Sequence, residues 1–197
     1  VACIRDGHAR LGAAGIGGPI DPPVAGGMLD WATFFLRYSA YLGYEREQDV
    51  PDLAGDNASY SRGVLAAHPE LLRDGFWEHE LHRRLRDEGG RLWFLPRMRV
   101  LQARSFGLGV FLRQRFEHGR RFGLERLRRR GMLYRCVAAL FAPLIVPLLL
   151  LRVARRVLRR RRFGGRFLAS LPALVAFATS WMLGEASAYY WPPRQAR

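Results

Sequence analysis

The sequence contains no lysine, because all 32 of its basic residues are arginine. A GC-rich coding bias explains this better than a recognition device, so no function follows from it. Cysteine is nearly absent too: Cys3 and Cys136 stand far apart, which excludes a disulfide framework or a zinc-finger spacing. The chain begins at Val1 with neither the basic nor the short apolar segment of a signal peptide. We expect that sequence upstream of Val1 is missing.

Acidic residues are scarce in the second half of the chain. Residues 1–90 hold 9 arginines against 14 acidic residues, a net charge of -5, whereas residues 91–197 hold 23 arginines against 3 acidic residues, a net charge of +20. A strongly basic half indicates a nucleic acid or an anionic membrane surface as partner. The hydrophobic content of 49% argues against disorder.

Two uncharged apolar runs lie within the basic half, at residues 137–151 and 167–184. As helices they reach roughly 22 and 27 Å, against a bilayer core of about 30 Å. The first run contains Pro143 and Pro147, so a shallow or re-entrant helix and a full span are both open. Arginines flank this run on both sides, which a simple span does not satisfy under the positive-inside rule. We therefore favour a shallow first segment and a spanning second one.

The segment between the runs, residues 152–166, holds eight arginines. Val153, Val157 and Leu158 recur at a helical spacing, which predicts a basic amphipathic linker lying on anionic lipid headgroups. A solvated charged linker is the alternative. Nucleic acid is not expected as a partner, because the chain has no known reading module and its apolar runs belong in a bilayer.

The first ninety residues read as an α/β layer. The pattern of apolar periodicity and turn residues predicts, in chain order, a strand within 14–20, a helix at 28–44, a loop at 49–57 and a helix at 61–67. A second helix opens within the stretch 75–90 and ends at the Gly89-Gly90 pair, and a strand follows at 91–96.

Residues 75–90 read GFWEHELHRRLRDEGG and crowd acidic groups and imidazoles into five positions. His79 and Glu80 begin the zinc-protease pattern H-E-x-x-H, but His82 follows His79 by three residues instead of four, so that motif is absent. A helix surface with these spacings is usually solvated, and we expect no metal site here.

An acid/base site is the better interpretation of the same stretch. Glu78 falls in the first turn of the predicted helix, where the positive end of the helix dipole keeps a carboxylate ionised and able to accept a proton from a hydroxyl. Phe76 and Trp77 would form an apolar wall on which a sugar ring stacks.

Five segments occur in an order that resembles the C-terminal part of family 2 glycosyltransferases, the membrane-associated enzymes of GT-A type. They are GGPIDPP (17–23), LAGDNASYSR (53–62), FWEHELHRRLRDEGGRLWFLP (76–96), RQRFEHGRRFG (113–123) and WMLGEASAYYW (181–191). The resemblance implies a partial GT-A-like domain, its acceptor-side half, at residues 1–130. A membrane-associated helical region follows at residues 131–197.

The resemblance also implies roles for single residues. Glu78 takes the position of the general base that deprotonates the acceptor hydroxyl. The positions that shape the acceptor side fall on Asp56, Asn57, Trp77 and Glu80. Those near the diphosphate leaving group fall on Gln114, Arg115 and Arg120.

The implied reaction is inverting transfer of a sugar from a nucleotide diphosphate sugar to a hydroxyl of a lipid-linked or glycan acceptor. The implied location is the bacterial inner membrane, with the catalytic part facing the cytoplasm. The family uses a divalent cation, Mg²⁺ or Mn²⁺, but this chain lacks its ligands: no Asp-x-Asp occurs, and Gln102 stands where many relatives carry His. We therefore expect the fragment alone to be inactive. The alternative is a non-catalytic membrane-surface or partner-binding module that uses the arginine-rich segments.

Overall fold

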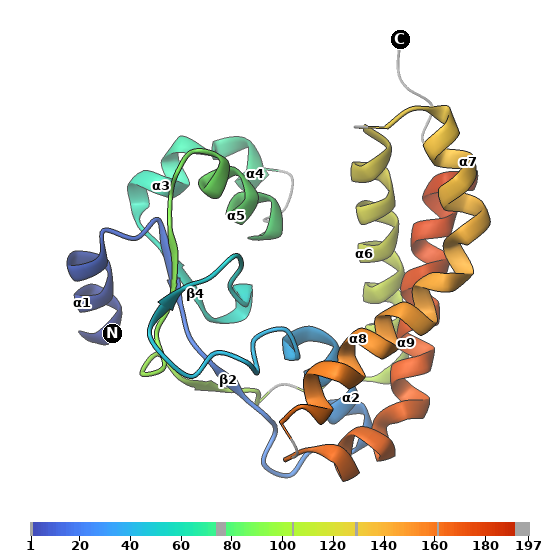
Figure 1. Cartoon of the computed structure of the whole chain (residues 1–197), viewed down its shortest axis with the longest axis horizontal. Coiled ribbons are helices and arrows are strands. Elements are labelled where there is room, and N and C mark those ends of the chain that lie inside the picture. Colours follow the sequence, from blue (N-terminus) through green and yellow to red (C-terminus); the bar gives the residue numbers. More distant parts are fainter. Residues whose placement is uncertain (1, 74–77, 104, 129, 161, 192–197) are drawn as a thin grey trace. The chain divides into compact units, whose positions relative to one another are not determined.

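The computed structural model describes residues 2–73, 78–103, 105–128, 130–160 and 162–191 (Figure 1). It is a mixed α/β protein, as the sequence predicts. Two compact units divide the chain: unit 1 comprises Val1–Pro23 and Ala40–Ala103, and unit 2 comprises Val24–Ser39 and Arg104–Arg197. These units divide at other residues than the domain boundary predicted at 130/131, which stays a prediction.

A small mixed sheet forms the centre of unit 1. Its strand order is β3-β5-β1-β4, with β1 (Gly15–Gly17) parallel to β5 (Leu92–Phe94) and antiparallel to β4 (Ala58–Tyr60). The edge strand β3 (Gln48–Asp49) pairs antiparallel with β5. A separate parallel pair joins β2 (Ile20–Asp21) to β6 (Val100–Leu101). The predicted strands within 14–20 and 91–96 are thus confirmed, and the second residue of β3, Asp49, falls inside the segment 49–57 that was predicted as a loop.

Close approach between chain segments explains the Gly-Gly-Pro sequence after β1. A Cβ at Gly18 would overlap the Met98 carbonyl, so no side chain fits there. The turn therefore brings the end of β1 directly against the segment that follows β5.

Helices flank the unit 1 sheet. They are α1 (Ala2–Leu11), which the sequence analysis missed, α3 (Arg62–Ala67), α4 (Pro69–Arg73) and α5 (Glu78–Asp87), together with the 3-10 turn η1 (Gly55–Asn57). Helix α3 starts where the side chain of Ser61 accepts a hydrogen bond from the Val64 amide. Helix α5 ends as predicted, because Gly89 adopts a φ of 82° and the Gly90 amide bonds back to the Leu85 carbonyl at 2.7 Å.

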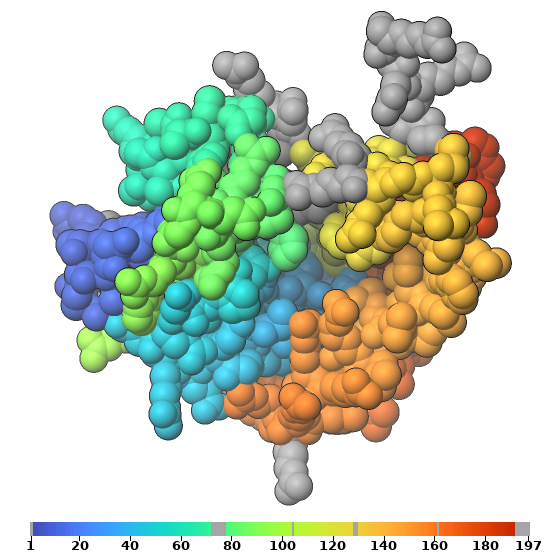
Figure 2. Space-filling model, turned by 45° about the horizontal axis from the view of Figure 1, so that its top comes forward, coloured from blue at the N-terminus to red at the C-terminus, as the bar shows by residue number. Residues whose placement is uncertain are grey.

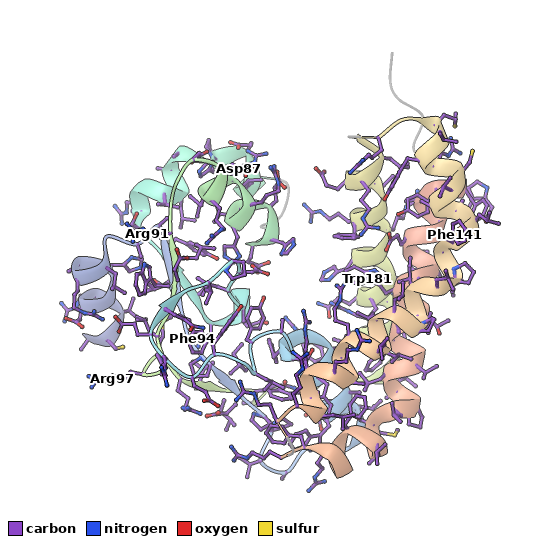
Figure 3. The ribbon with its side chains drawn as sticks, viewed as in Figure 1. Asp87, Arg91, Phe94, Arg97, Phe141 and Trp181 are labelled. Atoms are coloured by element: carbon purple, nitrogen blue, oxygen red, sulfur yellow. The ribbon has the colours of Figure 1, made fainter. Side chains whose placement is uncertain are left out.

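Two apolar clusters cover the two faces of this sheet. Leu81 and Leu85 from α5 pack with Val50, Leu53, Leu92 and Phe94, and the label in Figure 3 marks Phe94 in this core. Helix α1 packs on a second cluster around Ile16 and Leu95. With Leu81 and Leu85 packed in this core, the first residue of α5, Glu78, lies against η1.

In the part that the structure describes, unit 2 contains helices and connecting turns but no strand. Helix α2 (Met28–Tyr38) ends six residues before the predicted 44, and the chain after it belongs to unit 1. Its buried residue Phe35 packs against Phe163 and Phe167, with ring centroids 6.3 and 5.8 Å apart.

The first apolar run is part of a helix longer than predicted. Helix α7 (Met132–Phe141), the 3-10 turn η2 (Ala142–Leu144) and α8 (Ile145–Leu158) follow one another without interruption, and they form the gold-to-orange band on the surface in Figure 2. The 27 residues span about 40 Å at about 1.5 Å per residue. The short length of the run, one of the reasons for predicting a shallow placement, therefore no longer applies. Pro143 sits in the 3-10 turn, where its missing amide proton interrupts the ladder least.

Helices α6 (Leu108–Arg128) and α9 (Gly164–Tyr190) pack side by side and run parallel. A Cβ at Gly119 would overlap the Trp181 carbonyl, and one at Gly184 would overlap the Phe116 carbonyl. The two backbones therefore touch along a seam of small residues, as in closely packed membrane helices.

Candidate functional site

The predicted base, Glu78, lies at the first position of α5 and folds against the loop that contains η1. A Cβ at Gly55 would overlap the side-chain carboxyl group of Glu78, so the carboxylate rests directly on the glycine. Glu78 is half-buried, and no hydrogen bond or ion pair joins its carboxylate to any residue that the structure describes.

The neighbouring carboxylate, Glu80, has a different environment. It accepts hydrogen bonds from Arg83 at 2.6 and 3.0 Å and from Arg84 at 3.0 Å. These bonds, with that of Arg83 the strongest, lower the pKa of Glu80 to about 2. These bonds show that Glu80 joins Arg83 and Arg84 on the surface of α5, and the acceptor contact that the resemblance implies for it stays a prediction.

Asn57 holds the η1 loop to the rest of unit 1. Its buried side-chain amide donates to the Pro19 carbonyl at 3.1 Å and to the Met98 carbonyl at 2.7 Å. Both of its donors are used on the backbone, so it positions the loop, and a direct acceptor contact through them is not supported. Asp56 is exposed at the middle of η1.

The remaining predicted site residues lie elsewhere. Trp77 falls outside the described residues. Arg115 is buried in unit 2 with its guanidinium over the rings of Phe111 and Trp181, at 4.9 and 5.7 Å. Arg120 donates to the Ser187 hydroxyl at 3.0 Å, and the buried side-chain oxygen of Gln114 has no hydrogen-bond partner among the described residues. Arg115 and Arg120 thus take part in the contact between α6 and α9.

The most connected side chain near Glu78 is Asp52, which the sequence analysis did not single out. Its carboxylate accepts a hydrogen bond from His82 Nδ1, one from His79 Nδ1 at 3.0 Å, one from the Tyr41 hydroxyl at 3.2 Å and one from the Leu53 amide at 3.0 Å. Four bonds occupy all the lone-pair positions that a carboxylate offers. Asp52 therefore ties its own loop to α5 and to Tyr41.

A second link continues from this carboxylate to β4. His82 is 1% exposed, and its Nε2 lies 2.5 Å from the hydroxyl of Tyr60. An ionised carboxylate only accepts, so His82 Nδ1 carries the proton towards Asp52. In a neutral imidazole Nε2 is then an acceptor, and Tyr60 donates to it. The result is a three-residue chain, Asp52–His82–Tyr60.

The pKa shifts of Asp52 and Tyr60 agree with an ionised carboxylate at Asp52 and a protonated hydroxyl at Tyr60. Burial by itself would raise the pKa of the Asp52 carboxyl, but the hydrogen bonds from His79 and His82 outweigh burial and hold that pKa well below its usual range. The hydrogen bond to Asp52 raises the pKa of His79. Burial raises the pKa of the Tyr60 hydroxyl, and the negative charge of Glu78 adds to this effect. Asp52 is thus a carboxylate and Tyr60 a neutral phenol around neutral pH.

A cavity of about 310 Å³ opens beside this cluster. Its lining comes from one side of α5 and the adjoining loop: Pro51, Asp52, His79, His82, Arg83, Arg86 and Asp87. Glu78 does not line it.

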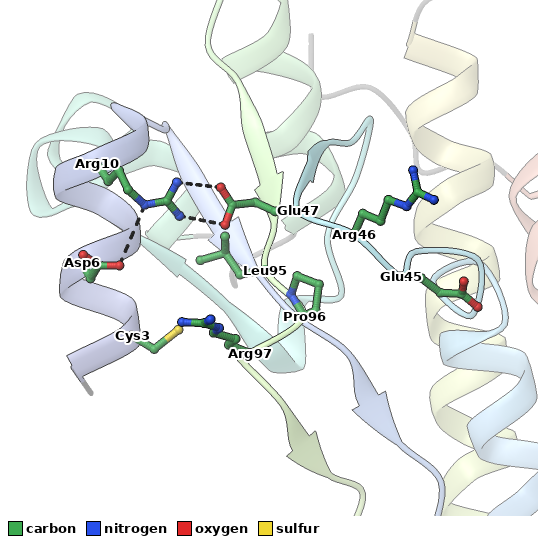
Figure 4. Close-up of a pocket in the computed structure, with 9 residues that line it drawn as sticks. All are labelled: Cys3, Asp6, Arg10, Glu45, Arg46, Glu47, Leu95, Pro96 and Arg97. Atoms are coloured by element: carbon green, nitrogen blue, oxygen red, sulfur yellow. Dashed lines mark hydrogen bonds and ion pairs between the residues drawn. The ribbon is translucent and has the colours of Figure 1, made fainter.

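A larger cavity of about 480 Å³ lies on another part of unit 1 (Figure 4). There the guanidinium of Arg10 makes two hydrogen bonds of 2.7 Å to Glu47, and Asp6 lies 3.9 Å from Arg10. None of the residues predicted for the site lines this cavity.

The described residues do not fit a divalent cation. Both oxygens of Asp52 already accept hydrogen bonds, and the Nδ1 atoms of His79 and His82 point at that carboxylate. No group of three or more His, Cys, Asp or Glu side chains among the described residues is arranged to hold a metal ion.

Sequence reasoning placed Glu78 and the Gly-Asp-Asn loop in one site but missed Asp52 and Tyr60. The available signal was the spacing of His82 four residues after Glu78, which puts both on one side of a helix. The burial of that side was not evident from a stretch so rich in charge.

Comparison with family models, curated proteins and solved structures finds no match for this chain. The resemblance to family 2 glycosyltransferases therefore rests on its ordered sequence motifs alone.

Proposed function

We propose that this chain is the acceptor-side and membrane-anchoring part of a family 2 glycosyltransferase of GT-A type. The reaction is inverting transfer of a sugar from a nucleotide diphosphate sugar to a hydroxyl of a lipid-linked or glycan acceptor. The residues that bind the nucleotide lie outside these 197 residues, because no Asp-x-Asp motif occurs among them.

The contact between Glu78 and Gly55 carries this proposal. It unites two motifs that lie 23 positions apart in the sequence, the glycine-led loop and the acidic helix start. Glu78 combines a half-buried position with oxygens that make no hydrogen bond or ion pair to described residues, which suits a general base. Glu80, held by two arginines, lacks that freedom.

In the proposed step, Glu78 removes the proton from the acceptor hydroxyl as its oxygen attacks the anomeric carbon. The bond between that carbon and the diphosphate oxygen breaks, and its electron pair leaves with the nucleotide diphosphate. The configuration at the anomeric carbon inverts because attack and departure occur on opposite faces. Arg115 and Arg120 are engaged between α6 and α9, so we place no step of the reaction on them.

The helices of unit 2 support a membrane location. Met132–Leu158 and Gly164–Tyr190 are each long and apolar enough to cross a bilayer. Only 11% of the most apolar window of the first helix is buried, and Phe141 lies on its outer side (Figure 3). We place the protein in the bacterial inner membrane with unit 1 on the cytoplasmic side.

A non-catalytic membrane module is the second candidate. The arginines that follow the apolar part of α8 favour it, because Arg155, Arg156 and Arg159 are exposed and would meet anionic headgroups. In such a module Glu78 would be an ordinary helix-start carboxylate.

The Glu78→Gln variant tests the proposed enzyme. Membranes that contain the full-length protein are incubated with a panel of radiolabelled nucleotide sugars, and transfer to lipid or glycan is measured. We expect the rate of transfer to fall by about 10²–10⁴-fold, the usual contribution of a general base. An amide of the same shape keeps the packing on Gly55.

The matched control is Glu88→Gln, the same change of side chain at an exposed carboxylate just beyond the opposite end of α5. Its transfer rate should stay within about twofold of the wild type. Unchanged transfer in Glu78→Gln, or equal losses in both variants, would refute the catalytic role of Glu78. Absence of transfer from every sugar in the panel would favour the membrane module.

A further inference from the structure

The start of α5 meets the 52–57 loop at two places. At one, the Glu78 carboxylate lies on Gly55. At the other, four residues further along α5, His82 donates to Asp52, three residues before that glycine. The two contacts join the same helix to the same loop, so the bond at one place sets the geometry at the other.

The two contacts differ in how firmly they are held. The Glu78 side chain makes no hydrogen bond to any described residue, and van der Waals packing alone places it on Gly55. The imidazole of His82 is buried and bonded at both nitrogens, to Asp52 and to Tyr60. The position of Glu78 therefore depends on the link at His82.

Tyr60 connects this link to the sheet. It is the last residue of β4, and β4 pairs with the central strand β1 in the register Gly15 to Tyr60. A Cβ at Gly15 would stand only 2.9 Å from the Tyr60 ring, so the ring is packed closely there. The sheet, through Tyr60, thus fixes the rotation of the imidazole.

We propose that Asp52, His82 and Tyr60 are positioning residues that hold the Glu78 carboxylate on the Gly55 loop in the orientation that accepts a proton. This inference rests on the proposed function of Glu78 as base. The three residues do not touch the substrate in this scheme. They act by fixing the helix start, since a misplacement of about 1 Å at a reacting group can cost about 100-fold in rate.

Two substitutions at residue 82 test the hydrogen bonds that join His82 to Asp52 and Tyr60. His82→Ala removes both bonds and should lower kcat by about 100-fold while KM changes by less than about threefold, because the acceptor contacts remain. In His82→Asn the side-chain amide nitrogen takes the place of Nδ1 and can still donate to Asp52. The kcat of His82→Asn should be at least about tenfold higher than the kcat of His82→Ala. Transfer is measured with the full-length protein in membranes.

Tyr60→Phe is the second variant, because it keeps the packed ring and removes only the hydroxyl. We expect a kcat about tenfold lower, with KM and thermal stability nearly unchanged. The matched control is His68→Asn, which removes another buried histidine of unit 1, one that lies 3.5 Å from Glu88. It should lower stability without lowering the kcat of the folded protein.

The positioning role is overturned if folded Tyr60→Phe retains the wild-type kcat, or if folded His82→Ala and His82→Asn lose the same activity. It is also overturned if the loss appears in KM alone. These results leave the proposed function intact as long as Glu78→Gln is inactive. If Glu78→Gln retains transfer, the proposed base fails first and the positioning role fails with it.

Discussion

Glu78 and Glu80 stand two residues apart on α5, yet their surroundings give them different chemistry. Arg83 and Arg84 hold Glu80 with hydrogen bonds of 2.6 to 3.0 Å, whereas no described residue pairs with the Glu78 carboxylate. A carboxylate saturated by guanidinium groups is a poor base, because its lone pairs are occupied. This difference favours Glu78 over Glu80 as the proposed general base.

The fit of Glu78 on Gly55 predicts the effect of a single methyl group. In Gly55→Ala the new Cβ would overlap the end of the Glu78 side chain, which can rotate away because it is flexible. We expect a kcat at least about tenfold lower with little change in the free energy of unfolding, because the carboxylate moves and the core does not. Transfer assays and thermal unfolding of the full-length protein measure the two effects.

Gly63→Ala is the matched control for this substitution. Gly63 lies in α3, where the nearest atom to an added Cβ is the Ser61 hydroxyl at 3.9 Å. Alanine should stabilise this helix by about 0.5–1 kcal/mol and leave transfer unchanged. Equal kcat values for the two alanine variants would show that the Gly55 contact does not matter for catalysis.

At the scale of elements, the seam between α6 and α9 depends on small residues. Gly119 and Gly123 on α6 lie four residues apart and face Gly184 and Ala188 on α9. The contact also buries Glu185, which accepts hydrogen bonds from Arg126 at 3.0 Å and from Tyr189 at 2.6 Å. The carboxylate is therefore paired where it enters an apolar interface, as burial of a charge requires.

Gly119→Ala should destabilise this seam. The added Cβ overlaps a backbone carbonyl, that of Trp181, and a backbone gives way less readily than a side-chain end. We expect a loss of about 1–3 kcal/mol, the usual cost of overpacking. Because Trp181 lies in the seam, its fluorescence during unfolding in detergent reports the separation of the helices.

Gly109→Ala is the control on the same helix, since no atom lies within 4 Å of a Cβ added there. It should be neutral or slightly stabilising. Identical unfolding curves for the two variants would contradict the tight seam.

The elements differ in how far the sequence predicted them. Helix α5 and its end at Gly89 followed from local signals, because a capping glycine acts within a few residues. The first apolar helix was predicted too short, because the predicted run, residues 137–151, ended at the nearest arginine on each side. In the structure α8 continues to Leu158, with Val153 and Val157 buried and the arginines outside.

At the scale of the whole molecule, the two apolar helices and the arginines predict different responses of membrane binding to salt. Salt at about 1 M shortens the Debye length to about 3 Å and removes most of the attraction between arginine and anionic lipid. Two inserted helices of 27 residues each would remain in the bilayer, since burial of apolar surface does not depend on charge. We expect the full-length protein to stay in the membrane pellet after a wash with 1 M salt.

Leu148→Arg provides the comparison, because Leu148 is 61% exposed within α8. An arginine in the middle of a span costs about 2.5–3.5 kcal/mol, so this variant should insert less completely and be partly extracted. Complete release of the wild-type protein by salt would instead support a surface module held by its arginines.

The sequence by itself determined the features that act over a few residues: the apolar periods of the helices, the capping glycines, the uneven charge and the order of the motifs around Glu78. Only the tertiary structure decided which distant residues meet. Asp52 and His82 lie 30 positions apart, Tyr60 and His82 lie 22 apart, and Gly119 and Trp181 meet across 62 positions. Local patterns carry no information on such distances, because contacts of this kind depend on the path of the whole chain and on which side of each helix becomes buried.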